Sequence, residues 1–510
     1  MAFAVAAAKR QGMAGDRGNG VAASDLREVR ASERLRAAPP RPLVVDLDHT
    51  LVRTDTLVES IVWILFHAPF RLFAVLAALP AGRAAFKAAV ARAARLDCAS
   101  LPYDEEILAL IRDRRTAGGE VHLVTAAHES IAAGVAAHLG LFDRVIGTAG
   151  DDNVKGARKA ARIAAAIAGP YAYIGDSRSD VPVWAAAEER LIVSRRPDFV
   201  ARIGREGIVP AAVLARPGGG PRAWVSALRL HQWPKNAILL APLALSQQIG
   251  NPRAALTALA AFLLFGLVAS ATYIVNDLAD LAADRVHATK RHRAFAAGRL
   301  SPLDGLAAAA ALMAAGLGLA FALHAGFGLY LAGYVGLTLL YSFRLKREPL
   351  VDVLVIGGLF SLRILAGMAV LDQPISLWLT SFTMMLFTGL AMAKRHAEVI
   401  RAARTGRALP GRDYEPGDAP ITAAIGVGAG VASTLVMLLY MQFEASLTGL
   451  YVRTGPLFVM PVVLASWLMR IWSRAQRGNL HDDPVIFALK DGVSWGHAAA
   501  IAILWVAAAY

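Results

Sequence analysis

The chain has 510 residues, 56% of them hydrophobic, and a formal net charge of +14. Such a length is more than one ordinary domain needs, and the single cysteine, Cys98, excludes an intramolecular disulfide and any metal site built from several cysteines. Apolar segments of near-spanning length recur after Pro234, so we expect an integral membrane protein with a soluble front part. Much of the positive charge lies beside these segments, where it would set topology and face anionic lipid, so no nucleic-acid partner is expected.

Residues 1–41 are rich in alanine, arginine and glycine and show no steady apolar period. A segment of this composition buries too little apolar surface to fold, so we expect a disordered tail. The opening apolar run of residues 1–5 has no basic residues before it, which argues against a cleaved secretory signal.

The first ordered element is expected at residues 43–45, a short apolar strand. This strand leads directly into Asp46 and Asp48, two carboxylates that are one residue apart. Because α/β sheets bind their ligands at the carboxyl ends of their strands, we expect both aspartates at a ligand-binding edge.

Further polar residues follow predicted elements in the same way. Thr125 closes the predicted strand 121–124, Lys155 opens a predicted helix, and Asp176 and Asp180 follow the predicted strand 171–174. With Asp46, Asp48 and Thr50 they form the motifs DxDxT, Thr, Lys and GDxxxD, in that order. This order resembles the haloacid-dehalogenase-like (HAD-like) phosphatases over about residues 42–212. The resemblance implies an α/β Rossmann-like domain with a helical cap at about residues 55–118.

The same resemblance implies a role for each motif residue. Asp46 would be the nucleophile that forms an aspartyl-phosphate, and Asp48 would protonate the leaving alkoxide and then activate water. Mg²⁺ would bind Asp46, Asp176 and the backbone carbonyl of Asp48, with Asp180 orienting this set. Lys155 and Thr125 would offset charge on the transferring phosphoryl group. Two alternatives stay open: chance carboxylates in a doubly wound domain, and a non-catalytic module that binds a partner.

The cap region contains an apolar insert at residues 61–79, about as long as a spanning helix. Pro69 and Arg71 interrupt its middle. We therefore expect a pair of cap helices that lies on the membrane and brings the phosphatase to a lipid-borne substrate. The alternative is a plain helical cap packed on the protein core.

A linker rich in proline and glycine is expected at residues 213–222, followed by a membrane domain over residues 223–510. This domain is predicted to be an all-α bundle of about nine spanning segments, near residues 236–250, 254–275, 305–323, 326–343, 350–370, 375–393, 420–440, 455–470 and 494–510. Alternate loops carry most of the lysines and arginines, whereas the opposite loops carry only Arg253 and Arg453. This asymmetry predicts a multi-pass protein of the bacterial inner membrane with the phosphatase domain and both active sites in the cytoplasm.

The second predicted span ends in an acidic stretch. On a helix Asn276, Asp280 and Asp284 stand at i, i+4 and i+8, and Asp277 stands three residues before Asp280. Like charges on one face at a membrane edge repel each other and are costly to desolvate. A divalent cation removes that cost, and Mg²⁺ takes carboxylates together with substrate phosphates. The alternative is a solvated acidic helix end.

Basic and polar residues that can bind phosphate recur on the same predicted side. They are Lys235 and Asn236 at the start of the first segment, Lys290 and Arg291 after the acidic stretch, and Tyr341, Arg344 and Lys346 before the fifth segment. Arg363 lies inside the fifth segment, where an unpaired cation is costly, so we expect it to face a polar cavity. Simple interfacial anchoring or topology signals are the alternatives for Lys235 and the group at 344–347.

The membrane part resembles the UbiA superfamily of intramembrane transferases over about residues 222–510. Two motifs carry this resemblance. The first is NDxxDxxxD, from Asn276 to Asp284. The second ends at Asp352, and it has Glu348 at the position where the family usually has an aspartate. The stretches HQWPKN, YSFRLKREPLVD and DDPVIFALKD look like the decaprenyl-phosphate phosphoribosyltransferase branch. That branch implies Mg²⁺ held by Asp277, Asp280, Asp284 and Asp352, so one Mg²⁺ is expected in each domain.

The two resemblances together imply a bifunctional enzyme. Phosphoribosyl diphosphate would give its 5-phosphoribosyl group to polyprenyl phosphate at the membrane site, with release of diphosphate. The phosphatase would then remove the 5-phosphate and leave polyprenyl-phosphoryl ribose. The rival function within the superfamily is an aromatic prenyltransferase that uses a prenyl diphosphate. The prenyl length and any homo-oligomer are left open.

Overall fold

The computed structural model describes residues 41–510 except 151, 217, 407–412, 448, 450, 481–483 and 510. Residues 1–40 of the predicted tail therefore lie outside the described residues. The chain divides into two compact units: the first comprises residues up to Ala223 together with Ala279–Leu303, and the second comprises Trp224–Leu278 and Asp304–Tyr510. The domain limits expected near residues 42, 212 and 223 stay predictions.

The first unit is built on a six-stranded parallel sheet with strand order β3-β2-β1-β4-β5-β6. The strands are β1 (Leu43–Val45), β2 (Val121–His128), β3 (Arg144–Thr148), β4 (Ala172–Gly175), β5 (Glu189–Ser194) and β6 (Ala212–Ala215). Val45 at the end of β1 stands opposite Leu123 of β2 and Ile174 of β4. The carboxyl ends of these three strands therefore meet at one edge, and the predicted α/β fold is confirmed.

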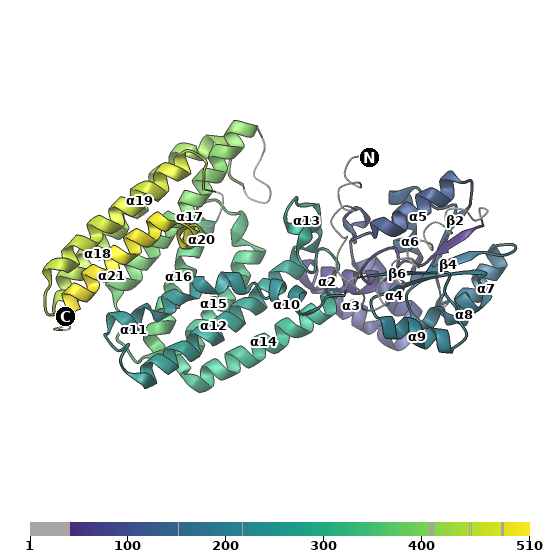
Figure 1. The fold of residues 1–510 in the computed structure, drawn as a ribbon, viewed down its shortest axis with the longest axis horizontal. Helices are drawn as coiled ribbons and strands as arrows, with labels where there is room; N and C mark the ends of the chain where they lie inside the picture. Colours follow the sequence, from purple (N-terminus) through teal and green to yellow (C-terminus); the bar gives the residue numbers. More distant parts are fainter. Residues whose placement is uncertain are drawn as a thin grey trace, which may run out of the picture. The chain divides into compact units, whose positions relative to one another are not determined.

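Helices cover both faces of this sheet (Figure 1). Leu43 and Val45 pack in one core cluster with α5 (Glu105–Thr116) and α6 (Glu129–Leu139). Val44 faces the other way, into a second cluster with α7 (Ala157–Ala166), α8 (Val181–Ala186) and α9 (Pro197–Arg205). The alternation follows from the two-residue period of a strand, and burial on both faces explains why β1 is apolar throughout.

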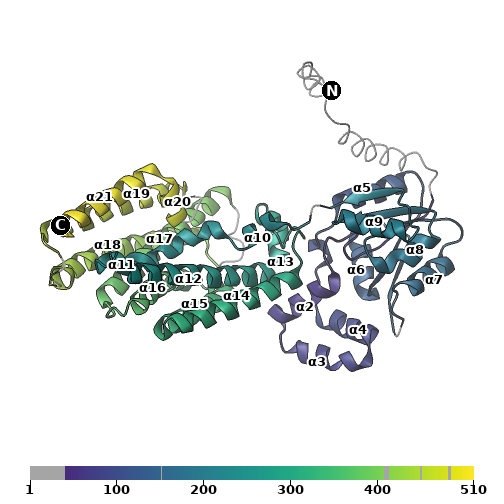
Figure 2. The same cartoon turned by 60° about the horizontal axis from the view of Figure 1, so that its bottom comes forward.

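The cap consists of three helices, α2 (Thr56–His67), α3 (Arg71–Ala77) and α4 (Arg83–Ala93), which form a compact group in Figure 2. Asp55 caps α2 by accepting hydrogen bonds from the amides of Leu57 and Val58. The helix is interrupted at residues 68–70, because Pro69 cannot continue it. The apolar insert is therefore a pair of short helices, as the two interrupting residues predicted.

The segment 279–303, which follows the second predicted span, belongs to the first unit. It contains α13 (Leu281–Val286) and the short helix η5 (Lys290–His292). Arg285 forms an ion pair of 2.5 Å with Glu59 of α2, and both side chains are buried. Arg195 donates to the carbonyl of Gly298 at 2.9 Å. Gly298 has a φ of +65°, and a Cβ there would lie 2.8 Å from that of Arg53, so only glycine fits this approach.

The second unit contains eight helical segments that are long and apolar enough to cross a membrane within the described part of the chain. They are α12 (Pro252–Ala279), α14 (Pro302–Leu323), α15 (Ala325–Phe343), α16 (Val351–Val370), α17 (Leu377–Thr405), Pro416–Leu447 with α18 (Ala419–Phe443), Gly455–Gln476 with α19 (Met460–Gln476), and α21 (Gly492–Ala509). The first two residues of α14 and the last of α12 fall in the first unit. The chain is an integral multi-pass membrane protein.

One of the nine predicted spans is wrong. Residues 236–250 do not form a spanning helix, because the chain folds there as the short helix η4 (Leu230–Leu240) followed by α11 (Ala241–Leu245). Pro234 and Pro242 each remove a backbone donor from this stretch. The stretch packs on α16 at Gly367, where a side chain would collide with the carbonyl of Leu239. Other short helices are α10 (Pro221–Ala227), η6 (Leu345–Arg347) and α20 (Pro484–Lys490).

Candidate functional site

Three aspartates of the first unit meet at the carboxyl edge of the sheet. Asp46 follows β1, Asp176 follows β4, and Asp180 ends the short helix η3 (Arg178–Asp180). Ligand oxygens of the three lie within 4.8 Å of one another, the one such group of three or more acidic side chains that the described residues contain. Carboxylate oxygens are the ligands that Mg²⁺ prefers, so this cluster fits a divalent cation.

The charges of this cluster are poorly compensated by the protein. Burial raises the pKa of Asp176 well above its ordinary value, and the negative charges of Asp46 and Asp180 raise that pKa further. Burial also raises the pKa of Asp46. A bound cation would reverse these shifts, because it would favour the ionised form of each carboxylate.

A lysine lies against two of these aspartates. The Nζ atom of Lys159 is 2.9 Å from Asp46 and 3.3 Å from Asp180, and it donates to the hydroxyl of Tyr173 at 2.7 Å. Lys159 is buried on α7, whereas the predicted Lys155 is exposed one turn earlier, before the helix begins. The structure therefore brings Lys159 to the carboxylates in the place that the motif assigned to Lys155. The two lysines are four residues apart, about one helical turn, so the sequence alone did not decide which of them reaches the carboxylates.

Asp48 lies beside the start of the cap. Its Oδ1 accepts a hydrogen bond of 2.7 Å from the amide of Thr56, the first residue of α2. Burial, followed by the negative charge of Asp55, raises the pKa of Asp48 to about 7. A carboxyl group with that pKa exchanges protons readily near neutral pH, as a general acid and base must. Thr125 is buried in β2, and its hydroxyl oxygen accepts from the amide of Ala127 at 3.0 Å.

Lys87, a residue that the sequence motifs did not identify, connects the cap to the core of the first unit. Its Nζ donates to the carbonyl of Ala126 at 2.5 Å and to Asn153 at 2.8 Å. Burial lowers its pKa, while the negative charge of Asp48 acts in the opposite direction. A cationic side chain from the cap therefore faces the region of the aspartates, a position suited to a phosphate group.

The second unit contains a cavity of about 300 Å³ with several cationic side chains in its wall. Four predicted residues line it: Lys235, Asn276, Tyr341 and Arg363. The structure adds Arg229, Lys394 and Arg395, which no motif indicated. Apolar residues such as Phe360 and Phe387 complete the wall. A cavity of this kind suits a ligand that joins anionic groups to an apolar part.

Arg363 is buried in α16 and lines this cavity. It donates to the Asn236 side chain at 2.9 Å, to the carbonyl of Leu359 at 2.7 Å and to the Tyr334 hydroxyl at 3.2 Å. Its guanidinium also lies 4.9 Å from the ring centre of Phe360. Among the described residues no carboxylate forms an ion pair with it. Neutral partners hold this cation in place and leave its charge available to an anion.

Two motif aspartates of the second unit are paired with arginines. Asp277 accepts from Arg229, whose guanidinium also stacks over the ring of Tyr273 at 5.0 Å. Asp352 is fully buried, with Arg395 at 3.1 Å and the hydroxyl of Tyr414 donating to it at 2.7 Å. Within the described part of the chain, neither carboxylate belongs to a group of three or more side chains that could hold a metal. A Mg²⁺ ion bound here would compete with Arg229 for the carboxylate of Asp277.

The remaining residues of the first acidic motif lie in the first unit. Asp284 is buried, and its carboxylate lies 2.6 Å from Arg293 and 3.7 Å from Lys290. Asp280 precedes α13, and its carbonyl accepts from the amide of Asp284. Arg291 is exposed. The carboxylate of Asp284 is therefore held by basic side chains, and among the described residues it belongs to no group of three or more potential metal ligands.

The second motif and its basic neighbours are spread over a turn. Arg344 is exposed, Lys346 is half-buried in η6, and neither is among the residues that line the cavity. Glu348 is exposed, and it contributes its backbone carbonyl, which accepts from the amide of Asp352. The glutamate that departs from the usual motif therefore supports the start of α16 through its backbone.

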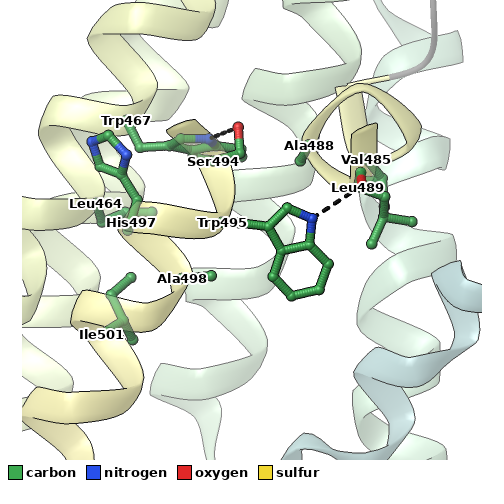
Figure 3. Close-up of a pocket in the computed structure, with 10 residues that line it drawn as sticks. All are labelled: Leu464, Trp467, Val485, Ala488, Leu489, Ser494, Trp495, His497, Ala498 and Ile501. Atoms are coloured by element: carbon green, nitrogen blue, oxygen red, sulfur yellow. Dashed lines mark hydrogen bonds between the residues drawn. The ribbon is translucent and has the colours of Figure 1, made fainter. Parts of the chain in front are cut away.

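A second cavity of the membrane unit is almost wholly apolar. It has about 270 Å³ and lies among α19, α20 and α21, lined by Leu464, Trp467, Val485, Ala488, Leu489, Ser494, Trp495, His497, Ala498 and Ile501 (Figure 3). Its polar atoms are engaged: Trp467 donates to Ser494 at 3.0 Å, and Trp495 donates to the carbonyl of Leu489 at 3.1 Å. Val485 lines both cavities. The cationic and the apolar cavity are therefore neighbours across α20.

Comparison with known proteins finds a matching family for each part of the chain. The UbiA prenyltransferase family matches residues 237–490, and the haloacid dehalogenase-like hydrolase family matches residues 43–185. All but two of the residues that line the cationic cavity, Arg229 and Lys235, lie in the first range, and the aspartate cluster lies within the second.

Three known proteins are similar to this chain over different shares of its length. The protein y4nM of Sinorhizobium fredii is 42% identical over 468 residues, which are 92% of this chain and 91% of that protein. Nodulation protein NoeC of Azorhizobium caulinodans is 36% identical over 277 residues, 53% of this chain and 88% of that protein. The decaprenyl-phosphate phosphoribosyltransferase of Mycolicibacterium smegmatis is 36% identical over 203 residues, 38% of this chain and 63% of that protein.

The matched ranges agree with the two structural sites, one at the edge of a parallel sheet and one among membrane helices. The chain belongs to the UbiA prenyltransferase family through its C-terminal part, and it carries a HAD-like hydrolase domain in its N-terminal part.

Proposed function

We propose that this protein is a bifunctional enzyme of lipid-linked sugar synthesis. Its membrane unit transfers the 5-phosphoribosyl group of phosphoribosyl diphosphate to polyprenyl phosphate, and its HAD-like domain then removes the 5-phosphate. The product is polyprenyl-phosphoryl ribose. The similarity to a decaprenyl-phosphate phosphoribosyltransferase supports the choice of substrates.

The observation that carries this proposal is the cationic cavity in the membrane unit. Arg229, Lys235, Arg363, Lys394 and Arg395 all line it, and no acidic residue is among its lining residues. Both proposed substrates are phosphate esters, so each would bring negative charge to these side chains. Lysine and arginine groups would also stabilise the diphosphate as it leaves.

The transfer step replaces one phosphate oxygen by another at the sugar. The bond between C1 of ribose and the diphosphate oxygen breaks, while an oxygen of polyprenyl phosphate forms a new bond to C1. The attacking phosphate is already ionised, so the step needs no general base. Arg363, held by Asn236 and Tyr334, is placed to bind a phosphate group during this exchange.

The apolar cavity would receive the first part of the polyprenyl chain. Since Val485 lines both cavities, a phosphate in the cationic cavity and an isoprenoid chain in the apolar one would lie on the two sides of α20. Isoprenoid units are bulky and apolar, as the indole and aliphatic lining of this cavity is.

The phosphatase step uses the buried cluster of the first unit. Asp46 attacks phosphorus, the bond to the 5-oxygen of ribose breaks, and Asp48 gives its proton to the leaving oxygen. Asp48 then takes a proton from the water that releases inorganic phosphate and restores Asp46. Lys159 stabilises the charge of the transferring group. Mg²⁺, when bound by Asp46 and Asp176, supplies further positive charge at the phosphoryl oxygens.

The proposal also includes a cellular location and a Mg²⁺ ion in the membrane unit. The charge asymmetry of the loops supports an inner-membrane protein of bacteria with both sites in the cytoplasm. A Mg²⁺ in the transferase motif stays a prediction, because Asp277 and Asp284 hold arginines in this structure.

The test uses the purified full-length protein with labelled phosphoribosyl diphosphate, polyprenyl phosphate and Mg²⁺. We expect label in the lipid fraction, first as the 5-phosphorylated lipid and then as its dephosphorylated form, resolved by mass spectrometry. If no labelled lipid forms while a prenyl diphosphate and an aromatic acid are coupled, the membrane unit is an aromatic prenyltransferase and the proposal fails.

A further inference from the structure

One edge of the cap exposes large apolar side chains. Phe70 is 84% exposed, Phe73 73%, Leu76 54% and Leu79 52%. They recur every third residue along α3 and the short helix η1 (Leu79–Ala81), so each is a neighbour of the next on the helix surface. Contiguous apolar surface of this kind marks a contact with another protein or with a membrane.

The opposite side of the same helix is apolar as well. Val75 is buried in a small cluster with Ile64 of α2 and Val90 of α4, and Leu72 packs against it. The cap core is therefore complete without Phe70, Phe73, Leu76 and Leu79. A helix that is apolar on every side is stable when a second apolar phase covers its outer face.

The charged residues around this edge indicate which kind of surface covers it. Residues 60–96 contain no aspartate or glutamate, but they contain Arg71, Arg83, Lys87, Arg92 and Arg95. Arg71 and Arg83 are exposed at the two ends of the apolar row. An apolar row between cations matches the surface of an anionic bilayer, where apolar side chains enter the headgroup boundary and arginines meet lipid phosphates. The chain itself supplies the bilayer as a neighbour, because eight of its helices can span one.

We propose that residues 69–83 dock the cap on the anionic surface of the bilayer, with Phe70, Phe73, Leu76 and Leu79 in the headgroup boundary. The cap is joined to the phosphatase site through Thr56, which donates to Asp48, and Lys87, which donates to Asn153. Docking therefore presents this site to phosphate esters carried by lipids. The docking stands whether or not the transferred group is phosphoribosyl.

The first test measures contact with lipid directly. In the full-length protein with Cys98→Ser, Phe73→Cys carries an environment-sensitive fluorophore, and the protein is reconstituted in vesicles of anionic and brominated phospholipids. The control is Ala201→Cys, an exposed position on α9. We expect bromine to quench the label at position 73 and to leave that at position 201 bright. No quenching at position 73, or equal quenching at both positions, overturns the proposal.

The second test measures the effect on activity. Phe73→Asp should lower hydrolysis of a phosphorylated lipid in vesicles about tenfold, the order expected from keeping one aromatic side chain out of an apolar phase. Hydrolysis of a small soluble phosphate ester should stay unchanged, which also shows that the domain is folded. The matched control is Val209→Asp, since Val209 is 72% exposed and lies outside the cap. Equal losses in the two variants overturn the proposal, whereas a wild-type protein inactive on every lipid refutes only the proposed substrate.

Discussion

The acidic motifs of the two units differ in how their charge is balanced. In the first unit three aspartates lie within 4.8 Å of one another and share one ammonium group, that of Lys159. In the second unit Asp277 pairs with Arg229, and Asp352 pairs with Arg395, which Glu398 also contacts. The first arrangement crowds three carboxylates around one cation, whereas in the second each motif carboxylate lies directly against a guanidinium.

This difference indicates which ligand each site is prepared for. Burial raises the pKa of Asp46 and Asp176 in the crowded set of carboxylates, and a bound cation would favour their ionised forms. Carboxylates that hold arginines position those arginines, and in the membrane unit the excess charge of the cavity wall is positive. The sheet edge is therefore suited to a metal cation, and the membrane cavity is suited to an anion.

The strongest test of this comparison is removal of the nucleophile. Asp46→Asn keeps the shape of the cluster but removes one charge, so we expect phosphatase activity to fall by about 10⁴-fold or more. Transfer in the membrane unit should persist, and the 5-phosphorylated lipid should accumulate in mass spectra of the reaction. If mutant and wild type yield the same phosphorylated lipid, the HAD-like domain acts on another substrate.

The next test separates the two lysines. Lys159→Gln should lower phosphatase activity by about 10²-fold or more, because it removes the cation beside the transferring phosphoryl group. Lys155→Gln serves as the control, since Lys155 is exposed, and it should stay within a few-fold of wild type. Steady-state hydrolysis of a soluble phosphate ester measures both. A larger loss in the Lys155 variant would restore the assignment made from the motif.

The membrane cavity is tested at its buried arginine. Arg363→Gln should weaken transfer by about 10- to 100-fold, chiefly through a higher KM for the anionic substrate, whereas Arg363→Lys should retain part of the activity. Initial rates of labelled lipid formation measure this. Arg253→Gln, an exposed change at the start of α12, is the control. A kcat and KM equal to those of wild type in Arg363→Gln would contradict the anion-binding role.

The smallest effect is expected at the buried aspartate of α16. Tyr414→Phe removes the hydroxyl that donates to Asp352 and accepts from the amide of Leu350. Losing a hydrogen bond to a buried charge costs about 1–3 kcal/mol, so the melting temperature in detergent should fall. The control is Tyr330→Phe, whose hydroxyl makes no hydrogen bond with the described residues. Equal melting temperatures would show that the Asp352 network adds little stability.

Much of the fold was predictable from sequence because it follows from periodicity. The apolar strand before Asp46 and eight of the spanning helices are read directly from residue type and length. The exception, residues 236–250, has the composition of a span, but prolines and the close packing on Gly367 shorten its helices. Hydropathy alone does not carry that information.

The candidate sites were predictable only where a motif fixes a position along a strand. Asp46, Asp176 and Asp180 meet because the parallel pairing of β1 with β4 brings their ends together. The partners Arg229 and Tyr414 come from distant parts of the chain, and no local pattern marks them. Lys159 was missed because two lysines one helical turn apart are equivalent in sequence, while only burial distinguishes them.

The ion pair between Glu59 and Arg285 has a consequence for dissecting the protein. Arg285 lies in the segment after α12, yet its buried partner is part of the cap. Cutting the chain at the linker near residue 220 would leave Glu59 in one fragment and Arg285 in the other, so separated fragments would lose this buried ion pair. Losing one member of such a pair costs about 3–5 kcal/mol. The two halves are therefore fused by more than the linker peptide, and fragments made by cutting there should each be less stable than the same regions in the intact chain.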